Sequence, residues 1–431
     1  MNIYKFLLKQ HIGAPAVPIV KEGGFVNRGE LIAAKALGVS TISANIHSSV
    51  RGKVISINED SIEISADNEA DVGNYIKLKS LTPLELVEEA GIVGLGGAGF
   101  PTHIKLSNPL KPGGTVILNA VECEPILGHN ILMIENKARK VIRGLHIAME
   151  IVQAKQGKVA VKEKHKEAIE ALEKAVDDYN IEICPLPDMY PVGEERAIIR
   201  ELQGQLLNIN ELPSSANSIV INAETAYRVY EAVDMKKPLI DKSITVAGKL
   251  KGASIQIFED VPIGTKVSTL LENAGGCRED YGELIMGGPF TGKRTTMDCP
   301  VVKTTGGILA TECFPKGPEK LGLLVCACGA DEKRMIEIAK DMGSHVTGIE
   351  YCKQAQKVNQ AYKCENPGKC PGQAGKVIAL KKTGAESLLI GNCTDCTNTV
   401  MSCAPQMKLA VYHITDGALR AVNHKLIRRL K

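Results

Sequence analysis

Residues 94–105 read GLGGAGFPTHIK, in which four glycines are followed by Lys105. Glycine has no Cβ, so the backbone N–H groups of such a loop can approach an anion closely. A lysine a few residues further on adds a full positive charge to the same place. The stretch therefore indicates a loop that binds a phosphate group, with a plain glycine-rich turn as the alternative.

Three of these glycines also have the spacing G-x-G-x-x-G, which is typical of dinucleotide-binding loops. That pattern requires a strand before it and a helix that opens inside it. The segment before the loop is predicted to be a helix instead: Thr82 suits the N-cap, Pro83 the first helical position, and Glu85 completes a capping box. We therefore reject a Rossmann-type site.

The composition excludes several classes of function. The 431 residues are enough for two to four domains, and 44% of them are apolar. The 52 basic and 49 acidic residues nearly balance and only 4% are aromatic, which argues against nucleic acid as a partner. No apolar run reaches the roughly 18 residues of a membrane span, and the first residues do not resemble a signal peptide. We expect a cytoplasmic globular protein that acts on small molecules or on other proteins.

The spacing of apolar residues divides the chain into four parts. Residues 1 to about 75 contain short alternating runs, which predict a small all-β unit. From about 80 to 235, helical stretches alternate with β-branched runs, a pattern typical of an α/β domain. Residues 240–276 predict a strand pair followed by a helix, and strands alternate with helices again after about residue 320. The predicted fold is a multidomain α/β protein.

Several segments of the chain resemble one group of proteins. The loop at 94–105 is similar to the flavin-binding loop shared by the NADH-oxidising flavoprotein subunit of respiratory complex I and the RnfC subunit of the Rnf complex. Three later segments match the same families in the same order: NAVECEP at 119–125, YPVGEER at 190–196 and NAETA at 222–226. The N-terminal unit resembles the barrel-sandwich domain of RnfC, and residues 240–276 resemble the SLBB-like β-grasp domain that follows in both families.

The resemblance implies four domains and two cofactors. The domains are a barrel-sandwich hybrid domain at 1–78, an α/β domain for FMN and NADH at 79–238, a β-grasp domain with its connector at 239–315, and a cysteine-rich α/β domain at 316–431. The resemblance puts Lys105 at the flavin phosphate. The full set that it implies around FMN and the nicotinamide donor is Gly94, Gly96, Gly97, Gly99, Lys105, Asn119, Glu122, Glu194, Glu195, Asn222 and Thr225. No residue is assigned as a catalytic acid or base, because hydride transfer requires none.

The match to these families also has departures. Val121 replaces an acidic residue of the complex I pattern, and residues 126–130 differ from the Tyr-containing continuation that is typical of RnfC. Glu194 and Glu195 also suit the exposed start of a helix, and Asn119 a turn at the end of a strand. The sequence alone therefore supports flavin binding more strongly than nicotinamide binding.

Cysteines are concentrated towards the end of the chain, where nine of the 13 follow residue 312. In a cytoplasmic protein such a group indicates metal or redox chemistry rather than disulfide bonds. Three groups of cysteines directly follow the predicted strands 322–325, 345–350 and 386–391, and the carboxyl ends of neighbouring parallel strands meet at one edge of a sheet. Soft thiolates that meet there suit an iron–sulfur cluster. The predicted ligands are Cys326, Cys328, Cys352, Cys364, Cys370, Cys393, Cys396 and Cys403.

Two alternatives remain for this tail: a zinc site, and a pair formed by Cys326 and Cys328 that cycles through a disulfide. The tail also resembles, distantly, the small MvhD-type iron–sulfur proteins of hydrogenase and heterodisulfide reductase complexes. Four further cysteines are isolated in the sequence and are predicted to be buried and structural: Cys123, Cys184, Cys277 and Cys299.

The combination of a flavin domain with this tail suggests a function. RnfC itself continues into ferredoxin-like clusters with the run C-x-x-C-x-x-C-x-x-x-C-P, which this sequence does not contain. A flavin domain joined to a different cysteine tail resembles the PrdC family of electron-transfer proteins associated with D-proline reductase. The resemblance implies that electrons pass from NADH through FMN and the cysteine tail to D-proline reductase or another reductase. The alternatives are an RnfC-type subunit that associates peripherally with a membrane complex, and a non-catalytic, zinc-stapled adaptor of a reductase.

Overall fold

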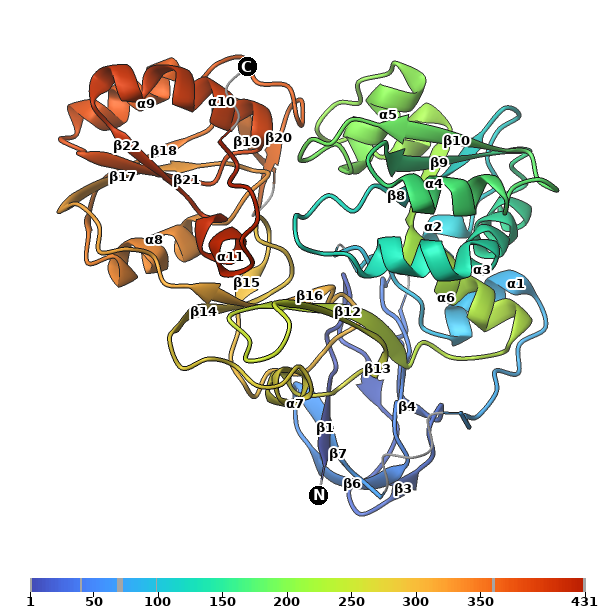
Figure 1. Cartoon of the computed structure of the whole chain (residues 1–431). Helices are drawn as coiled ribbons and strands as arrows, with labels where there is room; N and C mark the ends of the chain where they lie inside the picture. The colour runs from blue at the N-terminus through green and yellow to red at the C-terminus, as the bar shows by residue number, and fades with distance from the viewer. Residues whose placement is uncertain (1, 39–40, 68–72, 98, 359–360, 429–431) are drawn as a thin grey trace.

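A computed structural model shows the fold of the protein and describes residues 2–38, 41–67, 73–97, 99–358 and 361–428. Figure 1 shows four units: a blue β unit at the N-terminus, a cyan-to-green α/β unit, a yellow sheet, and an orange-to-red α/β unit that ends the chain. The two α/β units lie on the same side of the yellow sheet, and the blue unit lies on the other side. The predicted multidomain α/β fold is confirmed.

The N-terminal unit is made of two small antiparallel sheets. Alternate residues of its longer strands are buried: Val54, Ile62 and Ile64 are fully enclosed, as the alternating sequence predicts. One sheet has the strand order β1-β7-β6-β3, with β1 (Ile3–Leu7), β3 (Phe25–Val26), β6 (Gly52–Ile57) and β7 (Ser61–Ala66). The other has the order β2-β4-β5, with β2 (Val17–Pro18), β4 (Leu31–Ala34) and β5 (Ile46–His47).

The first α/β unit contains a four-stranded parallel sheet of order β10-β9-β8-β11. Its strands are β8 (Thr115–Ala120), β9 (Gln156–Lys162), β10 (Ile181–Leu186) and β11 (Ser218–Asn222). Its helices are α1 (Pro83–Glu89), α2 (Thr102–Leu106), α3 (His129–Ile151), α4 (Lys166–Glu173), α5 (Glu195–Gln203) and α6 (Ala223–Asp234), with a short 3₁₀ turn at Pro213–Ala216. The predicted capping box between Thr82 and Glu85 is present at the start of α1, so a helix and not a strand precedes the glycine loop.

The third unit is a mixed five-stranded sheet of order β13-β12-β16-β14-β15. Its central strands β12 and β16 run parallel, whereas its outer pairs are antiparallel. The strands are β12 (Asp241–Gly248), β13 (Ile255–Pro262), β14 (Tyr281–Met286), β15 (Lys293–Arg294) and β16 (Gly307–Glu312), and α7 (Val267–Asn273) packs on the sheet.

The C-terminal unit has a parallel sheet of order β18-β17-β21-β22. The strands are β17 (Lys320–Val325), β18 (His345–Tyr351), β21 (Ser387–Ile390) and β22 (Ala410–His413), and an antiparallel hairpin is formed by β19 (Ala355–Val358) and β20 (Ala361–Cys364). The helices are α8 (Glu332–Asp341), α9 (Ala374–Lys382), α10 (Thr394–Cys403) and α11 (Asp416–Ala421), with a 3₁₀ turn at Pro405–Met407. Since β17 lies between β18 and β21, the three strands that precede cysteines are neighbours, as predicted.

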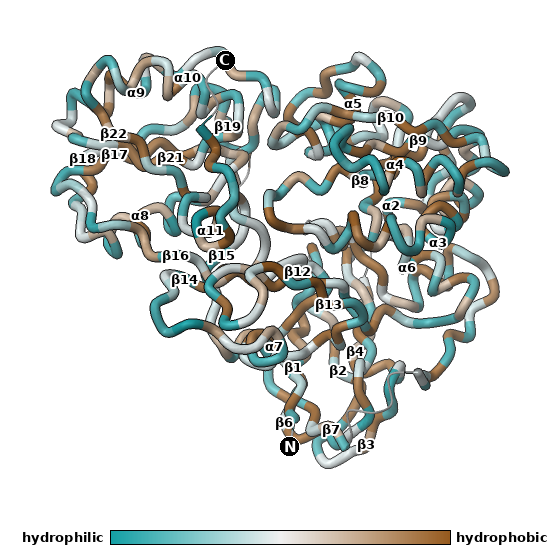
Figure 2. The backbone as a smooth tube through the Cα atoms, in the orientation of Figure 1, coloured by the Kyte–Doolittle hydropathy of each residue, from teal (hydrophilic) through white to brown (hydrophobic). Residues whose placement is uncertain are grey.

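The apolar residues gather inside each unit rather than on a surface stripe. Figure 2 shows the brown, hydrophobic stretches along the strands of both α/β units. Within the part of the chain that the structure describes, no helix combines the length and the apolar character needed to cross a membrane.

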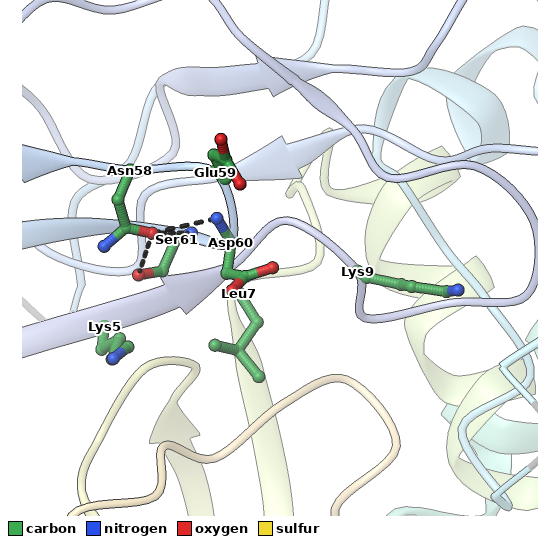
Figure 3. Close-up of a pocket in the computed structure, with 7 residues that line it drawn as sticks. All are labelled: Lys5, Leu7, Lys9, Asn58, Glu59, Asp60 and Ser61. Atoms are coloured by element: carbon green, nitrogen blue, oxygen red, sulfur yellow. Dashed lines mark hydrogen bonds between the residues drawn. The ribbon is translucent and has the colours of Figure 1, made fainter.

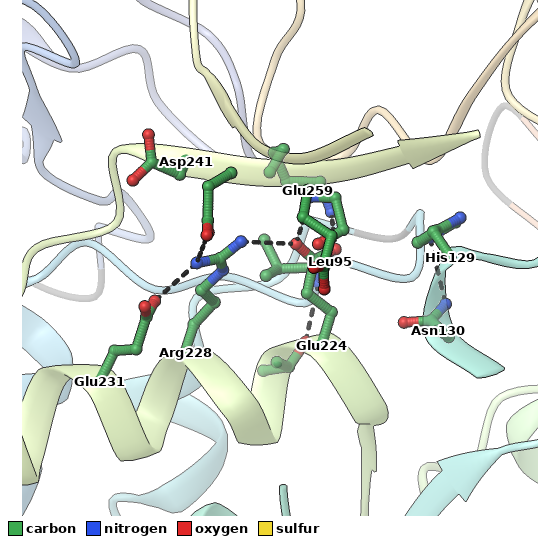
Figure 4. A network of polar contacts seen from close by, with 12 residues as sticks. Leu95, His129, Asn130, Glu224, Arg228, Glu231, Asp241 and Glu259 are labelled. Atoms are coloured by element: carbon green, nitrogen blue, oxygen red, sulfur yellow. Dashed lines mark hydrogen bonds and ion pairs between the residues drawn. The ribbon is translucent and has the colours of Figure 1, made fainter. Parts of the chain in front are cut away.

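A buried network of charged side chains joins three of the units (Figure 4). Arg228 of α6 pairs with Glu224 at 3.2 Å, and Lys242 of β12 pairs with the same carboxylate. Arg28 of the N-terminal unit pairs with Asp241 of β12 at 2.6 Å. The network contains four cations and four carboxylates: Arg28, Arg228, Lys237, Lys242, Glu224, Glu231, Asp241 and Asp260. Paired charges of this kind fix how the units pack, because each is costly to bury alone.

Four buried histidines make the fold sensitive to acid. Burial lowers the pKa of His47 to about 3 and the pKa values of His11, His103 and His129 to about 4. In an unfolded chain the same rings bind a proton near pH 6.5. Between about pH 6.5 and pH 4 the unfolded state therefore binds more protons than the folded state, so the free energy of unfolding falls as the pH falls.

We expect urea unfolding to show a steep loss of stability from pH 6.5 to pH 4, at most about 1.4 kcal/mol per histidine and pH unit. Glu122, whose pKa burial raises to about 7, acts with the opposite sign, but it is one group against four. His47→Gln should reduce the slope, whereas substitution of the exposed His424 should not. A free energy of unfolding that stays constant over this range would contradict the prediction.

Candidate functional site

A pocket of about 580 Å³ lies where three of the units meet. The first α/β unit supplies the glycine loop and the segments near 119–130, 190–196 and 220–225, and the third unit supplies residues near 287–291 and 304–306. The C-terminal unit contributes Cys328 and Cys364 among others. All of the residues predicted to surround the flavin line this pocket except Gly99, which packs instead against Thr304 and His11.

The glycine loop is held in shape by its own backbone and by α6. The N–H of Gly94 donates to the carbonyl oxygen of Phe100 at 2.8 Å. A Cβ at Gly96 would lie 3.2 Å from the side-chain nitrogen of Asn222, so the amide of Asn222 packs directly on this glycine. Gly97 has a φ of +116°, and its Cβ position faces open space. The loop therefore needs glycine for close packing at one position and for backbone conformation at the next.

Asn222 and Thr225 act at the junction of β11 and α6. Asn222 is the N-cap of α6, and its side-chain oxygen accepts hydrogen bonds from the N–H groups of Glu224 (3.0 Å) and Thr225 (3.3 Å). The hydroxyl of the buried Thr225 accepts a hydrogen bond from the N–H of Leu95 at 3.0 Å. The start of α6 thus fixes the position of the glycine loop.

Thr225→Val should destabilise the protein by about 1–3 kcal/mol, because it leaves the buried N–H of Leu95 without a partner. FMN affinity should fall several-fold as well, since the loop loses its anchor. Thr311→Val is a matched control: the Thr311 hydroxyl accepts a buried hydrogen bond from the N–H of Glu283 at 3.0 Å, away from the pocket. Urea unfolding should show similar losses for both variants. An FMN affinity reduced equally in both would contradict the special position of Thr225.

The acidic segment after β8 contributes two carboxyl groups with different partners. Glu122 has a φ of +38°, which is uncommon outside glycine, and its carboxyl group accepts a hydrogen bond from Asn130 at 2.7 Å. Burial, together with the nearby charge of Glu124, raises the pKa of Glu122 to about 7. Glu124 accepts hydrogen bonds from the N–H groups of Phe290 (2.7 Å) and Thr291 (2.8 Å). Glu124 therefore clamps the loop of the third unit to the pocket, a role that the sequence did not reveal.

The remaining predicted residues form polar pairs on the pocket wall. Lys105 contacts Glu195 at 2.8 Å and donates to the carbonyl oxygen of Val220. Glu194 caps α5 by accepting hydrogen bonds from the two N–H groups at its start, so its alternative role as a helix start is present beside its place in the pocket. Asn119 donates to the carbonyl oxygen of Gly193 at 2.9 Å.

Seven cysteines meet at the carboxyl edge of the C-terminal sheet. We call this group the cysteine centre; it consists of Cys326, Cys328, Cys352, Cys364, Cys370, Cys393 and Cys396. All seven are free thiols in the structure. Thiol–thiol hydrogen bonds join Cys326 to Cys328, Cys352 and Cys396, and join Cys396 further to Cys370 and Cys393. Cys364 is joined to the group through Cys328.

A buried amide also contacts the cysteine centre. The side-chain nitrogen of Gln373 donates to the sulfur atoms of Cys352 (3.2 Å) and Cys370 (3.4 Å), and lies 3.8 Å from that of Cys396. The pKa of Cys370 is lowered to about 6, chiefly by the hydrogen bond from the Cys396 thiol. These contacts stabilise negative charge on sulfur, which is the form that binds metals and reacts with disulfides.

The metal-binding capacity of the centre depends on its arrangement. The donor set, soft and buried thiols, suits an iron–sulfur cluster. As the side chains stand, however, no group of three or more His, Cys, Asp or Glu residues in the described ranges could hold a metal ion. The sulfur atoms contact one another instead, so a cluster requires them to separate.

Two sequence predictions about cysteines are corrected. Cys403 does not join the cysteine centre: it ends α10, about 10 Å along the helix from Cys396, and its thiol bonds to carbonyl oxygens of its own helix. Cys123 is not isolated, because it lines the pocket and packs against the cysteine centre. Burial raises the pKa of its thiol to about 12. The other three isolated cysteines, Cys184, Cys277 and Cys299, are only partly buried.

Aromatic rings and an arginine connect the pocket to the cysteine centre. Tyr190 and Phe290 are stacked with ring centroids 3.6 Å apart and planes 1° from parallel. The hydroxyl of Tyr190 donates to the carbonyl oxygen of Cys328 at 2.5 Å. Arg196, next to the predicted Glu194 and Glu195, donates to the carbonyl oxygen of Cys364 at 2.6 Å.

A second pocket, of about 600 Å³, lies on the N-terminal unit and contains none of the predicted site residues. Figure 3 shows that it surrounds the turn between β6 and β7, where the side chain of Asn58 accepts hydrogen bonds from the N–H groups of Asp60 and Ser61. These contacts belong to an ordinary turn. The pocket between the units is therefore the candidate site.

Two family models match the chain. The RnfC barrel-sandwich hybrid domain matches residues 2–72, and the Nuo51 FMN-binding domain matches residues 87–231. A search of solved structures finds the NAD⁺-reducing [NiFe]-hydrogenase, with a TM-score of 0.46 and 22% identity over 52% of this chain and 46% of that chain.

Curated relatives are similar over most of the chain. The RnfC-type subunit of the proton-translocating ferredoxin:NAD⁺ oxidoreductase complex of Clostridium ljungdahlii is 33% identical over 70% of this chain and 69% of its own length. The equivalent subunit of the Na⁺-translocating complex of Acetobacterium woodii is 34% identical over 72% and 73%, respectively. The cobalamin reductase PduS of Salmonella typhimurium is 37% identical over 59% of this chain and 54% of its own length. With a pocket built from the FMN-binding segments and relatives of this extent, the chain belongs to the RnfC family and contains a Nuo51-type FMN-binding domain.

Proposed function

We propose that this protein is a cytoplasmic electron-transfer component that takes electrons from NADH, through FMN, to its cysteine centre and then to a partner reductase. The observation that carries the proposal is a shared pocket: the glycine loop and two residues of the cysteine centre, Cys328 and Cys364, line the same cavity. A redox group bound at the loop would therefore lie beside the thiols without a further domain between them.

The chemistry of the pocket fits FMN. The loop around Gly97 leaves open space for a ligand, and Lys105 supplies a cation for its phosphate. Asn119, Glu122 and Asn222 offer polar groups to the ring and the ribityl hydroxyls, while Glu194 and Glu195 offer carboxylates to the ribose of NADH. When bound, FMN supplies the conversion between two-electron and one-electron transfer. The protein contributes position and exclusion of water.

For the cysteine centre we propose an iron–sulfur cluster. The support is the donor set: seven free thiols meet in a largely enclosed place, and Gln373 donates to their sulfur atoms. Zinc bound by the same thiols is the competing occupant and would make the tail a structural adaptor.

We further propose that the acceptor is a soluble reductase, D-proline reductase, as in the PrdC family. The support is the sequence of the tail, which lacks the ferredoxin run C-x-x-C-x-x-C-x-x-x-C-P. A second candidate is the RnfC position in an Rnf-type complex with peripheral membrane association, favoured by 33–34% identity to two such subunits.

Reconstitution of the full chain tests the proposal. Anaerobically purified protein is incubated with FMN, iron and sulfide, desalted, and examined by absorbance and metal analysis. We expect bound flavin, iron with acid-labile sulfide, and bleaching of the flavin band on addition of NADH. Zinc in place of iron, with no flavin, contradicts the electron-transfer function. Bound flavin that NADH does not bleach contradicts NADH as the donor. Electron delivery to purified D-proline reductase then distinguishes the soluble acceptor from an Rnf complex.

A further inference from the structure

Two thiols of the cysteine centre stand apart from the other five. Among the residues that the structure describes, Cys328 and Cys364 are the members of the centre that line the pocket. They come from different elements, the segment after β17 and the end of β20, yet their thiols are hydrogen-bonded to each other. The pair is therefore in mutual contact at the wall where the flavin is proposed to bind.

The surroundings of the pair distinguish its two members. A hydrogen bond from the Cys328 thiol, with the charge of Arg196 as a smaller cause, lowers the pKa of Cys364, although burial opposes this effect. The guanidinium of Arg196 is almost fully buried and donates to the carbonyl oxygen of Cys364. One of its nitrogens has no hydrogen-bond partner among the described residues. Cys364 is thus the better nucleophile, with Cys328 beside it as the second thiol.

The other five cysteines are sufficient for a cluster. Cys326, Cys352, Cys370, Cys393 and Cys396 form one connected group around Cys396, and a four-thiolate cluster needs only four ligands. Cys328 contacts Cys326 as well, so the pair lies between the pocket and this inner group.

We propose that Cys328 and Cys364 form a redox-active dithiol–disulfide pair that is reduced from the flavin pocket, and that the inner five cysteines hold the metal cluster. On oxidation two S–H bonds break and one S–S bond forms, and two electrons and two protons leave. On reduction the disulfide accepts two electrons and two protons from reduced flavin, which is oxidised in turn. The flavin as electron donor rests on the proposed function; the thiol pair itself does not.

Disulfide mapping of the full-length protein tests the pair. FMN-loaded protein is oxidised anaerobically with diamide and then treated with buffer, with NADH, or with light and EDTA to reduce the flavin. Free thiols are blocked with light N-ethylmaleimide under denaturing conditions, disulfides are reduced, and the new thiols receive heavy label. Fragment spectra must distinguish Cys328 from Cys326, since both lie in one tryptic peptide.

We expect heavy label at Cys328 and Cys364 after diamide, and light label at both after NADH or photoreduction. The exposed Cys313 should carry light label throughout. Recovery with light but not with NADH overturns the NADH donor and supports the pair. Heavy label at other positions, no disulfide, or a disulfide that reduced flavin leaves intact overturns the pair.

The double variant Cys328→Ser/Cys364→Ser gives a second readout that does not depend on activity. Because the inner five cysteines remain, its iron content after reconstitution should equal that of wild type and of the control Cys313→Ser. Loss of iron from the double variant, with an unchanged circular dichroism spectrum, overturns the division into pair and cluster. If the variant does not fold, the map of the wild-type disulfide decides alone.

Discussion

Gly97→Val is expected to weaken FMN binding at least about 100-fold, equivalent to roughly 2.7 kcal/mol. Gly97 lines the pocket with a φ of +116°, and no atom lies within 4 Å of the position that a Cβ would take. The valine side chain would therefore occupy space proposed for the ligand, and its backbone would prefer a different conformation. Quenching of FMN fluorescence during titration with apoprotein measures the affinity.

Gly113→Val separates the two causes. Gly113 also has a positive φ, +81°, and also faces open space, but it does not line the pocket. Both variants should lose some stability through backbone strain, whereas only Gly97→Val should lose FMN affinity. Normal FMN binding by Gly97→Val would show that the glycine loop does not face the flavin.

Local patterns in the sequence predicted most secondary structure because their causes are local. The capping box at Thr82 and Glu85 depends on residues three apart, and the structure contains it. The parallel strands of the C-terminal unit follow from short apolar runs separated by helices. From these strands the meeting of Cys326, Cys352 and Cys393 at one edge could be inferred without knowing a single contact.

The sequence could not reveal contacts between segments far apart in the chain. Glu124 clamps a loop 166 residues away, and nothing around it in the sequence indicates that partner. Gln373 has no motif, although it donates to sulfur atoms of the centre. Cys403 failed as a ligand because its position along α10 carries it away from the strand edge. The roles of the predicted flavin residues remain predictions that the variants test.

Arg228→Met is expected to lower the free energy of unfolding by about 3–5 kcal/mol. The guanidinium of Arg228 is 2% exposed and contacts Glu231 at 2.6 Å and Glu224 at 3.2 Å. Burial by itself raises the pKa of Glu224, and the charges of Lys242 and Arg228 reverse this effect and keep the pKa low. Methionine has a similar length but no charge, so the variant leaves buried carboxylates with too few cations. Urea unfolding followed by circular dichroism at pH 7 measures the loss.

Arg143→Met is the matched control, because it removes an arginine that also bonds a carboxylate. Arg143 contacts Asp234 at 3.0 Å, but both side chains are about one-third exposed, so water can replace the lost partner and the cost should stay below about 1 kcal/mol. Equal losses in the two variants would mean that the buried network adds nothing beyond a surface pair. A much larger loss at Arg228 would instead show that the flavin domain, the N-terminal unit and the third unit are held together by charge. Since the glycine loop is anchored to the start of α6, the same variant should then weaken FMN binding without touching the pocket.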